Sequence, residues 1–313
     1  MNAREIPPLV GESAAIRRVR DLIDRYAATA MSILIVGATG TGKEVVARHL
    51  HARSRRRGQF VPVNCGALPA EMVEGLLFGH RRGAFSGAVD AHRGFVECSD
   101  GGTLFLDEAL SLPPAGQAKL LRVIESQEIQ PLGSERLRPV DLRVVTAVQE
   151  DVVARRDRGA FRRDLYQRLA DVVIELPPLV ERMGDIVPIA LYYAARQGRT
   201  LEPGAVTVLR GYSWPGNVRE LCQVLERAAH LVVNGTLPPA AMAEAIALGA
   251  PSEPQRWPQA AMLTPARIAA ACAEHEWSVS RAAAALGVHR ATLFRRLRAL
   301  GLTLRQLRES QSH

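Results

Sequence analysis

The chain has 313 residues, of which 47% are hydrophobic and 23% are charged. This composition is typical of a globular protein, and the length suggests two or three domains with a buried core. No apolar run approaches the roughly 20 residues that cross a bilayer, and the N-terminus carries no apolar signal core. The four cysteines lie far apart in the sequence, so we expect neither a zinc site nor a disulfide framework. We therefore expect a cytoplasmic protein without a membrane partner.

The net charge of +8 is unevenly distributed. Residues 262–313 contain eight arginines, no lysine and three glutamates, so +5 of the net charge falls in this short segment. A small basic segment on a nearly balanced body indicates a nucleic-acid partner, although a solvated surface can have the same composition.

Short apolar runs alternate with helix-like segments from residue 1 to about 175. These runs lie at 32–36, 103–106, 142–146 and 172–176, and they predict a parallel sheet covered by helices. Two prolines at 177–178 end this region, and a helical pattern follows over 182–233. The predicted domains are an α/β domain (1–176), a helical subdomain (177–233), a linker with a short helix (234–261) and an all-α domain (262–313).

A glycine-rich segment follows the first predicted strand and precedes a helical pattern. Its glycines let backbone N–H groups converge on phosphates, and its lysine can reach the terminal phosphates. The segment therefore predicts a nucleotide site, with a plain glycine-rich turn as the alternative. Its residues are Gly37, Ala38, Thr39, Gly40, Thr41, Gly42, Lys43 and Glu44. Glu44 stands where the general pattern has a Ser or Thr that binds magnesium.

Two carboxylates, Asp107 and Glu108, follow the run at 103–106. The carboxyl ends of strands are where α/β sheets bind ligands. Asp107 would hold magnesium, and Glu108 would act as the general base toward the attacking water. An acidic pair at this place is often only the start of a solvated loop. Together with the glycine-rich segment, however, it predicts an enzyme that hydrolyses a nucleoside triphosphate.

The sequence of residues 77–88, Leu-Phe-Gly-His-Arg-Arg-Gly-Ala-Phe-Ser-Gly-Ala, points to a particular family. It resembles the signature loop of sigma-54-dependent transcription activators, the bacterial enhancer-binding AAA+ proteins, whose usual string is Gly-Ala-Phe-Thr-Gly-Ala. Segments 60–65, 161–169 and 214–221 resemble further motifs of this family, and Gly-Lys-Glu is its usual ending of the phosphate loop. The resemblance covers about residues 9–233 and 262–302. It implies an AAA+ P-loop fold with helices on both faces of the sheet, and a ring, usually a hexamer, with ATP between subunits.

The resemblance also implies roles at matched positions. Asn64 would couple to Glu108 as a switch that senses the γ-phosphate, and Arg219 would be the sensor arginine of the helical subdomain. Arg162 and Arg168 would reach the nucleotide of the neighbouring subunit, although arginines of an ordinary surface helix are the alternative.

The loop that would contact sigma-54 has a single aromatic residue between small ones, which favours a mobile loop with one anchor. A buried hairpin with the aromatic ring in the core is the alternative. The loop residues are Gly83, Ala84, Phe85, Ser86, Gly87 and Ala88. Ser86 stands in place of the family's Thr, so we expect weaker coupling to sigma-54. Val148 and Gln149 stand in place of Thr-Asn, which predicts slower hydrolysis, and Val180 replaces a frequent Arg.

Residues 278–297 have the spacing of a helix-turn-helix and resemble the Fis-type DNA-binding domain that ends this family. Ala283 is small where two helices would cross, Gly287 would make the turn, and Ala282, Leu286, Val288 and Leu293 would face inward. A plain helical hairpin is the alternative. The residues expected to contact DNA are His289, Arg290, Thr292, Arg295 and Arg296.

The leading hypothesis is an ATP-driven activator that binds an upstream DNA element and remodels sigma-54 RNA polymerase from the closed to the open complex. One alternative is a DNA-binding regulator whose motor no longer engages sigma-54. Another is an AAA+ remodeller of a different target. The phosphate loop begins near residue 37, so we expect no receiver, GAF or PAS domain. Control would then come from a regulatory protein, from the expression level or from a related subunit in a mixed ring.

Overall fold

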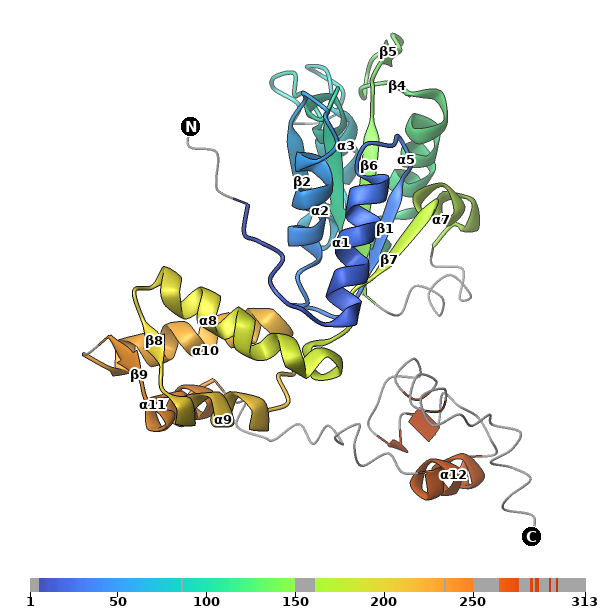
Figure 1. The fold of residues 1–313 in the computed structure, drawn as a ribbon. Coiled ribbons are helices and arrows are strands. Elements are labelled where there is room, and N and C mark those ends of the chain that lie inside the picture. The colour runs from blue at the N-terminus through green and yellow to red at the C-terminus, as the bar shows by residue number, and fades with distance from the viewer. Residues whose placement is uncertain are drawn as a thin grey trace. The chain divides into compact units, whose positions relative to one another are not determined.

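The computed structural model describes residues 6–85, 87–149, 161–233, 235–249 and 265–275, together with the single positions 282, 283, 285, 286, 293 and 297. The chain divides into two compact units, Met1–Ala245 and Ile246–His313. The first unit contains an α/β region followed by a helical subdomain (Figure 1).

A five-stranded parallel sheet forms the centre of the α/β region. Its spatial order is β2-β3-β6-β1-β7. The strands are β1 (Ile33–Val36), β2 (Phe60–Asn64), β3 (Thr103–Asp107), β6 (Arg143–Val148) and β7 (Val172–Glu175). A short antiparallel hairpin of β4 (Glu128–Ile129) and β5 (Arg138–Pro139) lies outside this sheet. The four apolar runs are thus all strands, as predicted, and the sequence pattern for a buried parallel sheet is confirmed.

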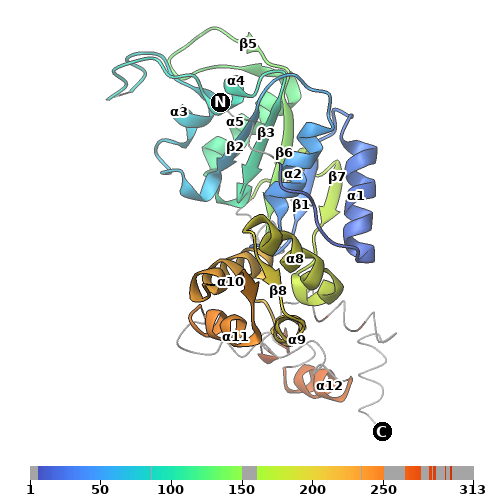
Figure 2. The ribbon, with the colours of Figure 1, turned by 60° about the vertical axis from the view of Figure 1, so that its left-hand side comes forward.

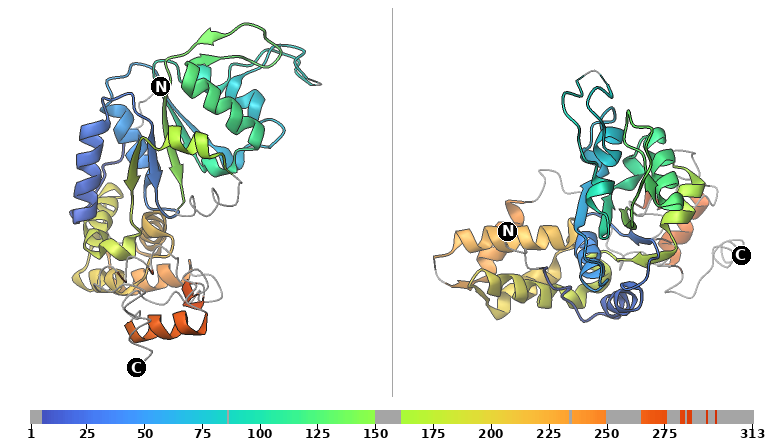
Figure 3. Two further views of the ribbon diagram at one scale, coloured as in Figure 1. Left: turned by 90° about the vertical axis from the view of Figure 1, so that its right-hand side faces the viewer. Right: turned by 90° about the horizontal axis from the view of Figure 1, so that it is seen from above.

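Helices cover both faces of this sheet, as the left panel of Figure 3 shows for the blue α1 on one side and the green α5 on the other. On the α1 face, α1 (Ala14–Tyr26) and α2 (Lys43–Ala52) pack against Phe105 of β3. On the α5 face, Leu104 and Leu106 pack with α3 (Val73–Phe78), α4 (Phe95–Cys98), α5 (Pro114–Ser126) and α7 (Arg163–Leu169). Successive β3 side chains therefore enter two separate cores, as the two-residue repeat of a strand requires. Two 3-10 turns, η1 (Cys65–Ala67) and η2 (Ala109–Ser111), follow β2 and β3.

The helical subdomain begins after Pro177-Pro178, and its helices gather around β8 (Figure 2). Its helices are η3 (Leu179–Asp185), α8 (Ile186–Arg196), α9 (Pro203–Gly211), α10 (Asn217–Leu231) and α11 (Pro239–Ala247). The strand β8 (Thr200–Leu201) pairs with β9 (Thr236–Leu237). The helix expected within the linker is α11, and it buries Met242 completely and receives a hydrogen bond from Arg227 of α10 to Ala245 O, 2.9 Å. This part of the expected linker is therefore packed on the helical subdomain.

The second unit contains α12 (Pro265–Glu274) and one apolar cluster. Ile268 and Cys272 of α12 are buried together with Ala282, Ala283, Leu286 and Leu293. The predicted inward-facing positions in the described part of this unit are thus confirmed, including the small Ala283. Val288 and Gly287 lie outside the described residues. Across the part of the chain that the structure describes, no helix is long and apolar enough to cross a membrane.

Candidate nucleotide site and signature loop

The glycine-rich segment 37–44 connects β1 to α2 at the carboxyl edge of the sheet. Gly37 N donates to Val148 O at 3.2 Å, which ties the loop to the end of β6. Gly40 has φ +79°, and a Cβ at this position would lie 2.2 Å from the carbonyl oxygen of Gly216. Only glycine fits here, because any side chain would meet the backbone of the helical subdomain. Gly42 is the N-cap of α2 and has φ +106°, so the loop runs directly into a helix N-terminus that favours anions.

Lys43 is the first residue of α2, and its side chain turns back to this loop. Its Nζ donates to Gly37 O at 2.9 Å and to Ala38 O at 3.1 Å. Thr41 Oγ1 also donates to Ala38 O, at 2.8 Å. Glu44 instead forms an ion pair of 2.6 Å with Arg48, one turn further along α2. The Lys43 side chain therefore lies at the loop, whereas the Glu44 side chain lies along α2.

Asp107 and Glu108 end β3 at the same edge of the sheet. Glu108 N donates to Asp107 Oδ1 at 3.0 Å, and Glu108 has φ +54°, which is uncommon for a residue with a side chain. The Glu108 carboxylate lies against Gly66 of η1, since a Cβ at Gly66 would be only 2.2 Å from Glu108 Oε2. The glycine therefore leaves the space that the carboxylate occupies.

Asn64 ends β2, directly beside Asp107 in the register of the sheet. Its Oδ1 accepts hydrogen bonds from Gly66 N (2.9 Å) and Ala67 N (3.2 Å). The Asn64 and Glu108 side chains thus meet at Gly66, and within the described residues no hydrogen bond joins them directly. Burial, followed by the charges of Asp107 and Glu108, raises the pKa of the neighbouring Cys65 thiol to about 12.

The end of β6 carries the departures expected to alter hydrolysis. Val148 is buried and packs against Leu34 of β1, whereas Gln149 is exposed. Thr146, two residues earlier, is buried and its Oγ1 has no hydrogen-bond partner. Val148 therefore contributes an apolar core contact at the end of β6.

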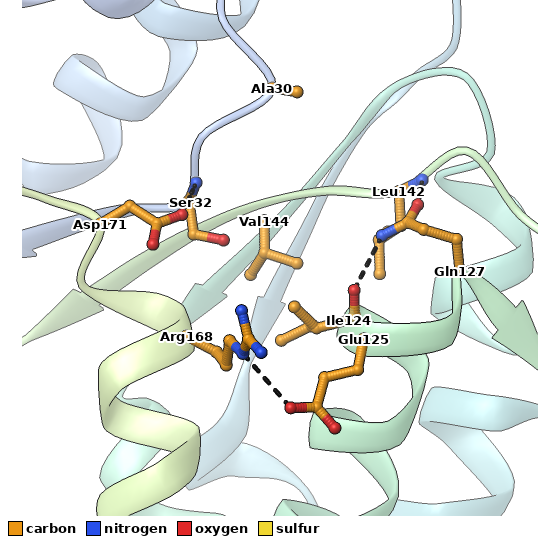
Figure 4. Close-up of a pocket in the computed structure, with 9 residues that line it drawn as sticks. All are labelled: Ala30, Ser32, Ile124, Glu125, Gln127, Leu142, Val144, Arg168 and Asp171. Atoms are coloured by element: carbon orange, nitrogen blue, oxygen red, sulfur yellow. Dashed lines mark hydrogen bonds and ion pairs between the residues drawn. The ribbon is translucent and has the colours of Figure 1, made fainter.

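The two arginines lie near opposite ends of α7. Arg162 precedes the helix and pairs with Asp164 through two hydrogen bonds of 3.0 and 2.7 Å. This hydrogen bonding lowers the pKa of the Asp164 carboxyl to about 2. Arg168 donates from Nε to Glu125 Oε1 of α5 at 3.2 Å, and Figure 4 shows the two side chains directed toward one another.

Arg168 lines a cavity of about 240 Å³ that also includes Ser32, Leu142 and Asp171. These three residues directly precede β1, β6 and β7. The cavity in Figure 4 therefore lies at the amino edge of the sheet. The glycine-rich loop follows β1 at the opposite edge, so Arg168 is remote from the nucleotide site of its own chain.

The helical subdomain touches the glycine-rich loop directly. Arg219 of α10 donates its backbone N–H to Gly40 O at 3.2 Å. Sequence reasoning missed two further contacts, from Asn217 Nδ2 to Thr39 O and from Arg182 Nη2 to Thr41 O, both 2.9 Å. Asn217 belongs to the motif at 214–221, but the motif alone did not indicate which of its side chains reaches the loop. For Arg182, the sequence showed only a charged residue shortly after Pro177-Pro178, and this did not indicate a contact with the loop.

The loop 83–88 is a turn held by its own backbone. Gly83 N donates to Ala88 O at 2.8 Å, and Ala88 N donates to Phe85 O at 3.0 Å. The Phe85 side chain is 46% exposed, and its ring meets the edge of His80 at 4.9 Å between centroids. The alternative of a core phenylalanine is therefore wrong. Ser86 lies outside the described residues.

A second loop, residues 131–138, runs beside this turn. Arg81 N donates to Leu132 O at 3.0 Å, and a Cβ at Gly133 would lie 3.0 Å from Ala84 Cβ. The two loops are thus in backbone contact at the base. The residues expected to contact DNA, at 289–296, lie outside the described residues.

Comparisons with known proteins agree with this architecture. Residues 9–175 match the family described as "Sigma-54 interaction domain", residues 180–258 match "AAA+ ATPase lid domain", and residues 266–300 match "Bacterial regulatory protein, Fis family".

Two curated relatives are regulators of transcription. The C4-dicarboxylate transport transcriptional regulatory protein DctD of Rhizobium meliloti (strain 1021) is 44% identical over 310 residues, which are 96% of this chain and 66% of that protein. The Sigma54-dependent transcriptional regulator SfnR of Pseudomonas fluorescens (strain Pf0-1) is 48% identical over 223 residues, 69% of this chain and 61% of that protein. The chain thus spans slightly less than two thirds of the length of these relatives.

Among solved structures, NtrX from Brucella abortus in complex with ATP is similar. It has a TM-score of 0.70 and 31% identity, and the match covers 94% of this chain and 70% of NtrX. The predicted fold class, an AAA+ P-loop fold with a helical subdomain and a C-terminal helix-turn-helix, is confirmed by these matches together with the sheet. The chain therefore belongs to the family of sigma-54-dependent transcriptional regulators.

Proposed function

We propose that this protein is an ATP-hydrolysing activator of transcription by sigma-54 RNA polymerase. In this proposal, the protein binds upstream DNA through the Fis-type domain and hydrolyses ATP as a hexameric ring. It remodels the closed promoter complex through the loop 83–88. The observation that carries this proposal is the presence, in one compact unit, of a glycine-rich loop that leads into a helix N-terminus and a turn that presents a half-exposed phenylalanine.

Nucleotide binding is supported by the loop geometry. The glycine-rich loop leads into the N-terminus of α2, where backbone N–H groups and the helix dipole favour phosphates. Lys43 Nζ already lies on the loop, within reach of two of its carbonyls. The solved NtrX structure is a complex with ATP, which supports ATP as the nucleotide here.

Asp107 and Glu108 supply the polar groups for hydrolysis. Asp107 offers carboxylate oxygens, the donor type that magnesium takes, at the carboxyl edge of the sheet. Bound ATP with magnesium would supply the phosphate bond to be broken and a charge that offsets the phosphate oxygens. Glu108 would accept the proton of the attacking water, and Gly66 gives its carboxylate room to be placed for that step. Asn64 lies beside the same glycine and is positioned to respond to Glu108.

The arginines support action between subunits. Arg168 lies at the edge of the sheet opposite to the phosphate loop of its own chain, so any nucleotide that it contacts belongs to another subunit. Arg162 is exposed, and among the described residues its guanidinium pairs with Asp164 of its own segment at the surface. We assign both to the transition-state charge of the adjacent subunit's nucleotide, and Arg219 to the nucleotide of its own chain.

Phosphate release from ATP by the purified full chain tests the enzymatic part of this proposal. Lys43→Ala should reduce the rate to background. The other lysine of the sequence, Lys119 on α5, forms an ion pair of 3.8 Å with Glu74 on α3 and provides a matched control. Lys119→Ala should keep the rate. Equal rates for the unsubstituted chain and Lys43→Ala would refute an ATPase and favour the alternative, a DNA-binding regulator whose motor no longer works.

A further inference from the structure

Three consecutive carbonyl groups of the phosphate loop accept hydrogen bonds from the helical subdomain. Thr39 O receives Asn217 Nδ2 at 2.9 Å, Gly40 O receives the backbone N of Arg219 at 3.2 Å, and Thr41 O receives Arg182 Nη2 at 2.9 Å. The donors come from α10 and η3, more than 130 residues away in the sequence. The helical subdomain therefore holds three successive peptide units of the loop through their carbonyl groups.

These contacts determine where the loop directs its N–H groups. A peptide unit is planar and trans, so its carbonyl and the following N–H point in opposite directions. A carbonyl of Thr39 or Thr41 that is held toward the helical subdomain turns the N–H of Gly40 or Gly42 away from it. Phosphate binding depends on such N–H groups. The side chains of Asn217 and Arg182 thus orient groups that they do not touch.

Asn217 is suited to this connection in both its backbone and its side chain. It has φ +54°, which asparagine tolerates better than most residues, and it is 3% exposed. Its amide is fully committed, because Oδ1 accepts from Leu179 N at 2.7 Å while Nδ2 donates to Thr39 O. Leu179 N can only donate and Thr39 O can only accept, so the amide orientation is determined by its partners.

Arg182 makes the second connection. It is also 3% exposed, and burial lowers the pKa of its guanidinium, against the opposing charge of Asp185. A buried guanidinium is costly unless its donors are used, and one of them is spent on Thr41 O. Asp185 in turn accepts hydrogen bonds from Glu12 N and Ser13 N, at 2.7 and 2.8 Å. The charge of Asp185 thus acts on Arg182, while its carboxylate holds the segment that precedes α1.

We propose that Asn217 and Arg182 are positioning residues that couple the helical subdomain to the phosphate loop. Nucleotide binding reorders the loop peptides and is transmitted to α10 and η3 through these two side chains, independently of any contact between Arg219 and the nucleotide. This inference rests on the proposed ATP site.

The test is hydrogen exchange, followed by mass spectrometry, on the full chain with and without a non-hydrolysable ATP analogue. In the unsubstituted protein, the analogue should slow exchange both in the loop 37–42 and in α10. Asn217→Gly keeps the positive φ and removes the side chain. Asn217→Asp keeps the acceptor for Leu179 N and removes the Nδ2 donor to Thr39 O, together with its longer hydrogen bond of 3.4 Å to the nearby Pro215 O. Arg182→Met removes the donor to Thr41 O.

Each variant should bind the analogue about tenfold more weakly, because a loop carbonyl loses the partner that orients its peptide unit. At saturating analogue, exchange should slow in the loop but no longer in α10. Arg227→Met is the matched control, because Arg227 Nε donates to Ala245 O within the helical subdomain and, among the described residues, Arg227 forms no hydrogen bond with the loop. This control should retain the response of α10.

The outcomes separate this inference from the proposed function. A response of α10 in Asn217→Asp and Arg182→Met equal to that of the unsubstituted chain would overturn the coupling, while ATP binding would stand. Absence of any response in the unsubstituted chain would overturn the ATP site itself. Thermal melting identifies the folded variants, and Asn217→Asp, which conserves shape, provides the test if the other two variants do not fold.

Discussion

The close approach of Glu108 to Gly66 leads to a sharp prediction about catalysis. In Gly66→Ala, the new Cβ would lie 2.2 Å from Glu108 Oε2 and 3.3 Å from Asn64 Oδ1. Carbon–oxygen contacts settle at about 3.3 Å or more, so the carboxylate must retreat by about 1 Å. The φ of Gly66 is not in the left-handed region, so the alanine itself introduces no backbone strain.

The expected cost falls on hydrolysis rather than on stability. The Glu108 carboxylate is the end of a flexible side chain and can move away, so the free energy of unfolding should change by less than about 1 kcal/mol. A misplacement of about 1 Å in a catalytic group costs roughly a hundredfold in rate, which corresponds to about 2.7 kcal/mol of activation free energy. We therefore expect a hundredfold slower phosphate release with unchanged ATP affinity.

Phosphate release and binding of a fluorescent nucleotide would be measured on the same preparation. Gly184→Ala is the control, because a Cβ at Gly184 meets no atom within 4 Å and its backbone is not left-handed. Phosphate release by Gly66→Ala within twofold of the control, at equal nucleotide affinity, would refute Glu108 as the general base in this position.

Three further predictions concern stability, the signature loop and pH. Asp185→Ala removes the acceptor of three hydrogen bonds, which come from Glu12 N, Ser13 N and Ser13 Oγ. The free energy of unfolding, measured in urea, should therefore fall by about 3 kcal/mol. A loss below about 1 kcal/mol would contradict this expectation. Phe85→Ala should lower the free energy of unfolding by about 1 kcal/mol at most, because the ring is 46% exposed, and should leave ATP hydrolysis intact. A large drop in either quantity would contradict a role of Phe85 that is confined to the exposed loop. Burial raises the pKa of Cys65 from 9.0 to about 12, so the folded state holds the proton more tightly and stability should fall as the pH rises from about 9 toward 12. Cys65→Ser should remove that decline, and an unchanged decline would mean that another group titrates.

Much of the α/β region could be predicted because its determinants are local. Apolar runs such as 33–36 and 103–106 are buried strands, and the glycine-rich loop lies where its neighbouring strand and helix require it. The half-exposed Phe85 was also expected, since a single aromatic residue among glycines and alanines cannot be enclosed by its own loop.

The residues that sequence reasoning missed act over long distances in the chain. Asn217 and Thr39 are separated by 178 positions, and Arg182 and Thr41 by 141. Neither contact follows from periodicity, because each depends on how two packed regions meet. The helix α11 was expected only as a short element of a linker, because its alanine-rich sequence does not reveal that Met242 is fully buried.

Formation of the open complex by sigma-54 holoenzyme on a supercoiled promoter tests the account most directly. With the purified full chain, the promoter should melt with ATP but not with a non-hydrolysable analogue, and Phe85→Ala should abolish melting while it continues to hydrolyse ATP. ATP hydrolysis by the unsubstituted chain without any promoter melting would contradict the proposed coupling between the phosphate site and the loop 83–88.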